Sequence, residues 1–287
     1  MVLISLIGDV MLGRSFNDHI FNHKSLDYPW GNTINILKKS DIVIANLETT
    51  ITNSNDKWIN KTFNYKLLPK YAKSLQFANI SYCSLANNHI LDFNVIGMYD
   101  TFKNLDKLDI KYAGAGKNIY QAMKPVFITK NNTKIGFLSA ADHYDYWKAT
   151  IKSPGIWYIP IRDGNLMSWN PIFEYVRKIK QKCDILIFSL HWNYNYVDNI
   201  DPIFKNFGHS LIDNGVDIIH GHSPHHIIPI ERYKTGIIMY SLGDFVDDYV
   251  IDKRYRNDIS MIVNINLEDM ELKIYPIQIK NMQVNLM

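Results

Sequence analysis

The sequence predicts an α/β fold in which helices cover a sheet. Short apolar runs recur along the 287 residues, and segments with helical spacing lie between them. The runs lack the alternation of half-exposed strands, which is typical of strands that are buried on both faces. They span residues 2–7, 42–45, 80–85, 185–190, 216–219 and 236–242.

Four segments between these strands carry apolar residues at helical spacing. Their stripes are Trp30, Ile34 and Leu37; Tyr71, Leu75 and Ala78; Met98, Phe102, Leu105 and Leu108; and Phe173, Val176 and Ile179. Pro69, Pro171 and Pro202 lie near the predicted starts of three helices, where a missing N–H is tolerated. Alternation of strand and helix places the helices outside the sheet.

Two further stretches predict strand pairs. Residues 124–141 contain two apolar runs around a polar Lys-Asn-Asn-Thr turn, and residues 258–267 and 271–279 form another pair. We expect such strands to build a second sheet, which the C-terminal strands at 258–279 close, in a layered α/β/β/α body. Because no linker, repeat or low-complexity tract divides the chain, we expect a single domain over residues 1–287.

Composition and charge exclude several classes of protein. Hydrophobic residues make up 47% of the chain and charged residues 21%, which excludes global disorder. The net charge of +3 is too small to indicate a nucleic-acid partner. The two cysteines, Cys83 and Cys183, fit a reducing compartment. With Met1 as the start, the absence of a signal peptide and of ~20-residue apolar segments predicts a soluble cytoplasmic protein without a membrane anchor.

Each of the six apolar runs leads into residues that can bind a metal ion. These are Asp9; Glu48; Asn88; His191; His222 and His225; and Asp244. Each residue alone is explained as a turn former or a helix cap. Because loops converge at the carboxyl ends of strands in such sheets, the set together predicts a divalent metal site with oxygen and imidazole ligands.

A two-metal hydrolase needs a bridging carboxylate, further ligands and a free histidine for proton transfer. Asp9 or Glu48 can supply the bridge. Asn88, His191, His222 and His225 can complete the ligand shells. His89, next to Asn88, is then left to protonate a leaving group.

Six motifs in series carry a resemblance to a known family. They are GDVMLGR at 8–14, NLET at 46–49, NNHILD at 87–92, HW at 191–192, GHSPH at 221–225 and YSLGDF at 240–245. Together they resemble the CapA family, named for poly-γ-glutamate capsule synthesis proteins, within the calcineurin-like metallophosphoesterase superfamily. The resemblance spans about residues 2–250.

The resemblance implies a four-layer α/β/β/α sandwich of the metallophosphoesterase type with a dinuclear metal centre. It implies Asp9 as the first-strand ligand, Glu48 as the bridge, Asn88 as the amide ligand, His191, His222 and His225 as imidazole ligands, and His89 as the proton donor. His226 competes with His225 for one position, and we favour His225. Met11 stands where typical superfamily members have a histidine, so we expect one metal position to be under-coordinated, weakly bound or empty.

Five further residues have two interpretations each. Arg14 can clamp an anionic substrate or tie its loop to the protein. Trp192 can line a substrate groove or pack under it. Asp92 can orient His89, but we favour an N-cap for the following helix. Asp244 can hold a cation or cap a turn, and we expect a structural role for Glu231. The histidines at positions 19, 23, 143, 209 and 220 are expected to be structural.

The leading interpretation is a CapA-like, metal-dependent hydrolase of phosphoesterase type, with two manganese, iron or zinc ions. Its expected substrate is a small anionic ester or a γ-glutamyl polymer. The alternative is a non-catalytic accessory protein that binds an anionic polymer in poly-γ-glutamate synthesis.

Overall fold

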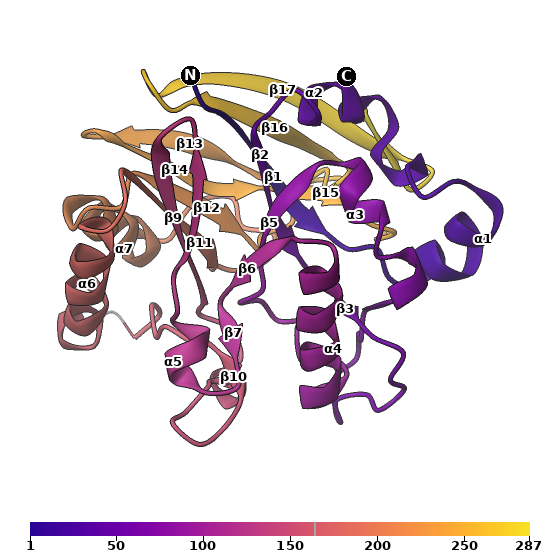
Figure 1. The fold of residues 1–287 in the computed structure, drawn as a ribbon, viewed down its shortest axis with the longest axis horizontal. Coiled ribbons are helices and arrows are strands. Elements are labelled where there is room, and N and C mark those ends of the chain that lie inside the picture. Colours follow the sequence, from indigo (N-terminus) through magenta and orange to yellow (C-terminus); the bar gives the residue numbers. More distant parts are fainter. Residues whose placement is uncertain (164) are drawn as a thin grey trace.

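Two β-sheets pack face to face with helices on both outer sides. The computed structural model describes residues 1–163 and 165–287. Figure 1 shows α6 and α7 on the left and α3 and α4 on the right, with the strands between them. The predicted four-layer α/β/β/α sandwich is confirmed.

The larger sheet contains the N-terminal strand and the C-terminal strands. Its order is β18 (Gln283–Leu286), β17 (Glu271–Lys280), β16 (Ile259–Asn266), β1 (Leu3–Val10), β2 (Ile42–Leu47), β5 (Ile80–Ser84) and β6 (Lys111–Ala113), and β15 (Asp244–Val246) pairs with the end of β1. The strands β1, β2, β5 and β6 are parallel. Their carboxyl ends therefore meet at one edge of the sheet.

The second sheet has six strands. Its order is β13 (Ile227–Tyr233), β14 (Gly236–Leu242), β12 (Ile218–His222), β11 (Ile185–His191), β9 (Thr133–Ala141) and β8 (Val126–Lys130). Strands β9, β11, β12 and β14 are parallel. Two short pairs lie outside the sheets, β3 (Thr50–Ile51) with β4 (Lys66–Leu67), and β7 (Ala115–Gly116) with β10 (Gly155–Ile156).

Three apolar clusters fill the spaces between the layers. Ile42 and Ile44 of β2 face the other sheet, whereas Val43 and Ala45 face the helices. Strands buried on both faces explain why the apolar runs in the sequence do not alternate. The helices are α1 (Phe21–His23), α2 (Ile34–Leu37), α3 (Ser74–Phe77), α4 (Asn94–Lys107), α5 (Ile119–Ala122), α6 (Leu166–Lys180) and α7 (Pro202–Asp213).

Two expectations about the fold are corrected. The strand pairs at 124–141 and 258–279 do not share a second sheet, because β8 and β9 join β11 whereas β16 and β17 extend from β1. The C-terminal strands thus close the sheet of the N-terminal strand. Pro171 lies inside α6, which begins at Leu166, whereas Pro202 is the first residue of α7 as predicted.

His220 connects the two sheets. It is buried on β12, with Nδ1 2.9 Å from Ser189 Oγ and Nε2 2.8 Å from the Ile7 carbonyl oxygen of β1. The carbonyl accepts from Nε2, so the neutral ring satisfies both contacts when Nδ1 accepts from the serine. Burial lowers the pKa of His220 to about 4. The structural role expected for this histidine agrees with these contacts.

A His220→Gln variant is expected to have a flatter dependence of stability on pH. Between about pH 4 and 6.5 the unfolded chain binds a proton at His220 that the folded chain excludes, so the wild-type free energy of unfolding rises with pH and levels off above this window. Urea unfolding in chelator is expected to give a slope lower by up to roughly 1.4 kcal/mol per pH unit for the variant. Equal slopes would contradict this role of His220.

Candidate metal centre

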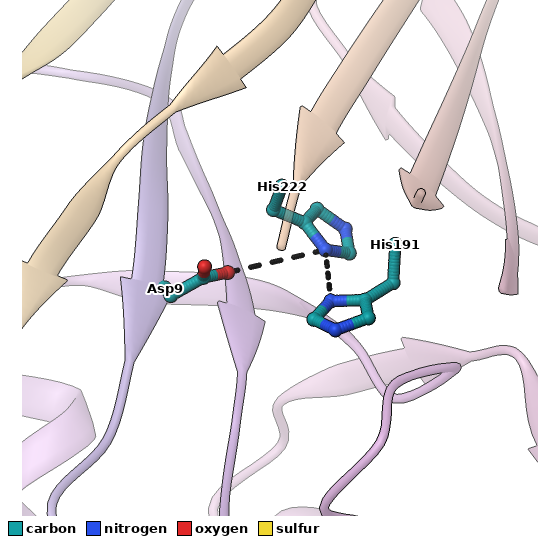
Figure 2. Close-up of side chains that lie close together, drawn as sticks. All are labelled: Asp9, His191 and His222. Atoms are coloured by element: carbon teal, nitrogen blue, oxygen red, sulfur yellow. Dashed lines mark hydrogen bonds and ion pairs between the residues drawn. The ribbon is translucent and has the colours of Figure 1, made fainter. Parts of the chain in front are cut away.

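One group of ligand atoms lies where β1 meets the second sheet. His191 and His222 end neighbouring parallel strands and are in register, which brings their Nδ1 atoms to 2.9 Å. His222 Nδ1 lies 3.9 Å from Asp9 Oδ1 at the end of β1. Figure 2 shows both imidazoles and the carboxylate turned toward one another. All three side chains are buried, so the group has the residues and the enclosure of a cation site.

A second group shares Asp9 with the first. It contains Asp9, Glu48, His225 and Asp244, whose candidate ligand atoms lie within 4.8 Å of one another. Asp9 and Asp244 are in register on β1 and β15, and His225 Nδ1 lies 2.8 Å from Asp244 Oδ1. Asp9 is therefore the carboxylate common to both groups. The bridging role assigned to Glu48 stays a prediction.

Close packing at the end of β1 fixes the position of Asp9. A Cβ atom on Gly8 would lie 1.8 Å from the Gly243 carbonyl oxygen, so only glycine fits there. The Asp9 N–H donates to the same carbonyl at 3.1 Å. On its side chain, Oδ1 accepts from Asn46 Nδ2 at 2.7 Å. The aspartate is thus held from both the main chain and the side chain.

The turn after β12 separates His225 from His226. Ser223 and His225 have φ values of 107° and 65°, a backbone region that costs energy for residues other than glycine. This turn directs His225 toward Asp9 and Asp244. In contrast, both ring nitrogens of His226 lie 2.8 Å from backbone carbonyl oxygens. The geometry therefore favours His225 as the ligand, in line with the preference from sequence.

Several buried polar atoms at the centre have no hydrogen-bond partner within the described part of the chain. They are Glu48 Oε1 and Oε2, Asn88 Oδ1, His191 Nε2, His222 Nε2 and Asp244 Oδ2. Each unsatisfied buried polar atom costs about 1–3 kcal/mol, and more when it is charged. Carboxylate, amide and imidazole donors are the ligands of manganese, iron and zinc. The residues present therefore fit divalent cations.

The electrostatics of the centre also favour a cation. Burial, and then the carboxylates of Asp9 and Asp244, raise the pKa of Glu48 well above its usual range. Burial and the Asp9 carboxylate raise the pKa of Asp244 in the same direction. Burial lowers the pKa of His191 and His222, so both imidazoles are neutral and can act as ligands. A bound cation would compensate the clustered negative charge.

Met11 does not belong to either ligand group. Its buried Sδ atom instead accepts the Gly13 N–H at 3.1 Å. A thioether is a poor ligand for hard divalent ions. Weak binding of one of the two ions therefore stays a prediction.

His89 lies beside the ligand groups without being part of them. Its Nε2 is 3.8 Å from Glu48 Oε1, and its Nδ1 is 2.7 Å from Asp92 Oδ2. The Tyr65 ring stacks on the imidazole with 4.0 Å between centroids. Burial lowers the pKa of His89 to about 4. Asp92 does not cap the following helix, which has Phe93 at its N-cap, so the favoured N-cap interpretation is wrong.

A cavity of about 640 Å³ opens onto His89 and His225. Its aromatic lining consists of Phe63, Tyr65, Tyr144, Tyr146, Tyr196 and Tyr249. Arg14 also lines it, with Nε 3.4 Å from Asp248 Oδ1 and the guanidinium carbon 5.7 Å from the centre of the Tyr65 ring. Arg14 thus ties its loop to the protein and also faces the cavity.

Trp192 does not reach this cavity. Its side chain is 1% exposed, its Nε1 donates to the Tyr240 carbonyl oxygen at 3.0 Å, and its ring stacks on that of Tyr240. It belongs to the cluster between the second sheet and its helices. The groove interpretation of Trp192 is therefore corrected to packing.

Glu231 and His209 form a contact away from the centre. His209 Nε2 lies 2.9 Å from Glu231 Oε1, and the Tyr240 hydroxyl donates to Oε2 of the same glutamate at 2.8 Å. These contacts agree with the structural role expected for Glu231.

Sequence reasoning missed two charged residues at the centre. Lys61, 8% exposed in its side chain, pairs with Asp92 and lies 2.9 Å from His89 Nδ1. Asp247 is buried near Asp244, and burial raises its pKa well above the usual range. The acid-rich run after β14 was a signal for Asp247. Lys61 lies in a polar segment of residues 52–65, where nothing distinguishes it from a surface lysine.

Solved structures identify the class of fold. A phosphatase from Mycoplasma pneumoniae has a TM-score of 0.57 at 14% identity, with 97% of this chain and 93% of that chain covered. A hypothetical protein from Thermus thermophilus has a TM-score of 0.54 at 12% identity, with 99% of both chains covered. The chain has the fold of the calcineurin-like metallophosphoesterases.

Sequence relatives identify the family. The sequence model of the bacterial capsule synthesis protein PGA_cap matches residues 3–249. A "Probable polyglutamine synthesis accessory protein" of Mycobacterium tuberculosis is 34% identical over 84% of this chain, and the "PGA biosynthesis protein CapA" of Bacillus subtilis is 31% identical over 85%. The chain belongs to the PGA_cap (CapA) family. It spans 65% and 63% of the length of these two relatives.

Over residues 1–163 and 165–287, no helix combines the length and hydrophobicity needed to cross a membrane.

Proposed function

We propose that this chain is a metal-dependent hydrolase that cleaves an anionic ester at the ligand groups around Asp9. The observation that carries the proposal is the convergence of buried ligand atoms without hydrogen-bond partners at the ends of strands from both sheets. Such an arrangement is costly for the protein alone and becomes favourable when cations bind.

The residues around Asp9 divide the chemical tasks. Divalent cations bound at these groups would activate water and offset negative charge that develops on the ester. Asp9, Glu48 and Asp244 supply the negative charge that holds the cations. With its Nδ1 hydrogen directed at Asp92, His89 carries a proton on Nε2 only as an imidazolium. The negative charge of a bound ester favours that form, and His89 then passes the Nε2 proton to the leaving oxygen.

The cavity favours an anionic substrate. Arg14 and Lys61 line it, and no aspartate or glutamate does so among the described residues. Attraction by these cations would direct a phosphate ester or a γ-glutamyl chain toward His89. We propose these two classes as substrates, the second because of the capsule and polyglutamate names of the relatives.

A non-catalytic accessory role in anionic-polymer synthesis is the second candidate. It is favoured by the name of the relative from M. tuberculosis, which is called an accessory protein. In this role the cationic cavity would hold the polymer without cleaving it.

Metal analysis of the purified protein, followed by turnover of p-nitrophenyl phosphate with and without Mn²⁺, separates the two candidates. We expect bound metal and a metal-dependent rate that a chelator abolishes. A protein with neither bound metal nor turnover would support the accessory role.

The same assay predicts different outcomes for two histidines. His222→Ala is expected to lower the metal content, because it removes a ligand from the group that contains His191. His209→Ala is the matched control, since His209 contacts Glu231 outside both ligand groups and its loss should leave the metal content unchanged. Full metal retention in His222→Ala would remove that residue from the ligand set.

A further inference from the structure

Lys61 is a buried ammonium group that contacts the centre from a loop. It lies between β3 and β4, and its side chain is 8% exposed. Its Nζ pairs with Asp92 Oδ1 and lies 2.9 Å from His89 Nδ1. The rings of Trp147 and Tyr144 lie 5.3 and 5.7 Å from Nζ. A lysine is rarely buried to this degree unless it is paired, and Asp92 is the partner that permits its burial here.

Asp92 connects this loop to His89. Its Oδ2 accepts from the Tyr65 N–H at 2.6 Å and lies 2.7 Å from His89 Nδ1. Its carbonyl oxygen accepts from the Trp58 N–H at 2.8 Å. One buried aspartate therefore joins the loop that carries Lys61 to the imidazole, and Lys61 is its cationic partner.

These contacts all involve one edge of the imidazole. Nδ1 is adjacent to both Asp92 and Lys61, whereas Nε2 is directed toward Glu48, 3.8 Å away. The ring face is covered by Tyr65. With Nδ1 and the ring face held, Nε2 is the ring nitrogen left to contact a ligand in the cavity that His89 lines.

We propose that Lys61 is a positioning residue that holds His89 through Asp92, so that Nε2 faces the leaving group. This inference rests on the proposed hydrolase function. Lys61 neutralises the buried Asp92 carboxylate and keeps the aspartate beside Nδ1. Without the ammonium group, Asp92 is an unpaired buried charge. We then expect the aspartate and the imidazole to change position.

The rate loss in a Lys61 variant should depend on the leaving group of the ester if Lys61 positions His89. It should be the same for all esters if Lys61 has only a general structural role. An aryl oxide leaves without prior protonation, whereas an alkyl oxide needs the proton from Nε2. Lys61→Met is expected to lower kcat on an alkyl phosphate ~10–100-fold, as is usual for residues that orient a functional side chain. On p-nitrophenyl phosphate kcat should change little, whereas KM is expected to rise for both esters because a cation is lost from the cavity. Combination with His89→Ala is expected to add no further loss.

Two matched variants control for charge and for folding. Lys66→Met removes a lysine at the start of β4, whose Nζ contacts Ser54 and Asn55, and should leave both rates unchanged. Lys61→Arg keeps the charge and is expected to restore most of the alkyl-phosphate rate. Equal losses on both esters, or a change confined to KM, would overturn the positioning role.

A second measurement does not depend on turnover. The ring ¹⁵N–¹H signal of His89 Nδ1, assigned by its absence in His89→Ala, is expected to exchange slowly with water in the wild type and rapidly in Lys61→Met. Unchanged exchange in Lys61→Met overturns the inference even if no ester is cleaved. If the protein shows no turnover but Lys61→Met still abolishes the slow exchange, the positioning role is supported. In that case only the hydrolase function is contradicted.

Discussion

Replacing His89 with alanine is expected to slow hydrolysis of an alkyl phosphate by ~10²–10⁴-fold while the metal content stays unchanged. His89 belongs to neither ligand group, and its Nδ1 is occupied by Asp92. Removal of the imidazole therefore deletes the proton donor without removing a ligand. Metal analysis and steady-state kinetics on the same sample measure both quantities.

His222→Ala provides the contrast for this experiment. Its imidazole is a member of a ligand group, so its metal content is expected to fall along with its rate. If His89→Ala lost as much metal as His222→Ala, the separation of proton donor from ligands would be wrong.

Replacing Asp9 with asparagine is expected to have the other large effect. Asp9 is common to both ligand groups, so its loss should weaken metal binding at both of them. Glu48→Gln instead removes a ligand from one group only. Loss of the ions forfeits several kcal/mol of transition-state stabilisation, a rate decrease of ~10³-fold or more. Metal-to-protein ratios for the two variants, measured together, decide which carboxylate bridges. A larger loss in Glu48→Gln would assign the bridge to Glu48.

Glu48→Gln has a second expected signature in the metal-free protein. Neither carboxylate oxygen of Glu48 has a hydrogen-bond partner among the described residues, and burial raises its pKa well above the usual range. In chelator at neutral pH the neutral variant should therefore be more stable to unfolding by about 1 kcal/mol or more. The gain should fade near pH 4, where the wild-type carboxyl is protonated in both states. If the variant were instead less stable than the wild type in chelator, the buried Glu48 carboxylate would not be destabilising the metal-free protein.

Strand positions were predictable from sequence because they depend on local composition. Burial on both faces selects continuous apolar runs, so residues 42–45 and 236–242 indicated their strands directly. The choice of sheet for residues 258–279 depends instead on which strand edge is free after the rest has folded. A period-two pattern carries no information about that partner.

The centre was predictable to the extent that its residues follow strands. Asp9, Glu48 and His222 stand at strand ends, where parallel topology brings them together. Lys61 has no such signal, because its burial follows from the Asp92 carboxylate and the aromatic rings around it. The sequence left Trp192 open between groove lining and packing, because an aromatic ring serves both. The structure packs it, since adjacent residues of an extended segment point to opposite sides and His191 faces the centre.

The position of β1 between β2 and β16 has a consequence for synthesis on the ribosome. β1 is made well before β15 and β16, which pair along its other side and lie at Asp244–Val246 and Ile259–Asn266. At translation rates of 5–20 residues per second, that edge of the nascent strand waits about 10–50 s for its partners. During this interval an apolar strand with free amide and carbonyl groups is open to wrong pairing, and the cation pocket cannot yet assemble. Productive folding of this chain therefore depends on shielding β1 until β15 and β16 emerge.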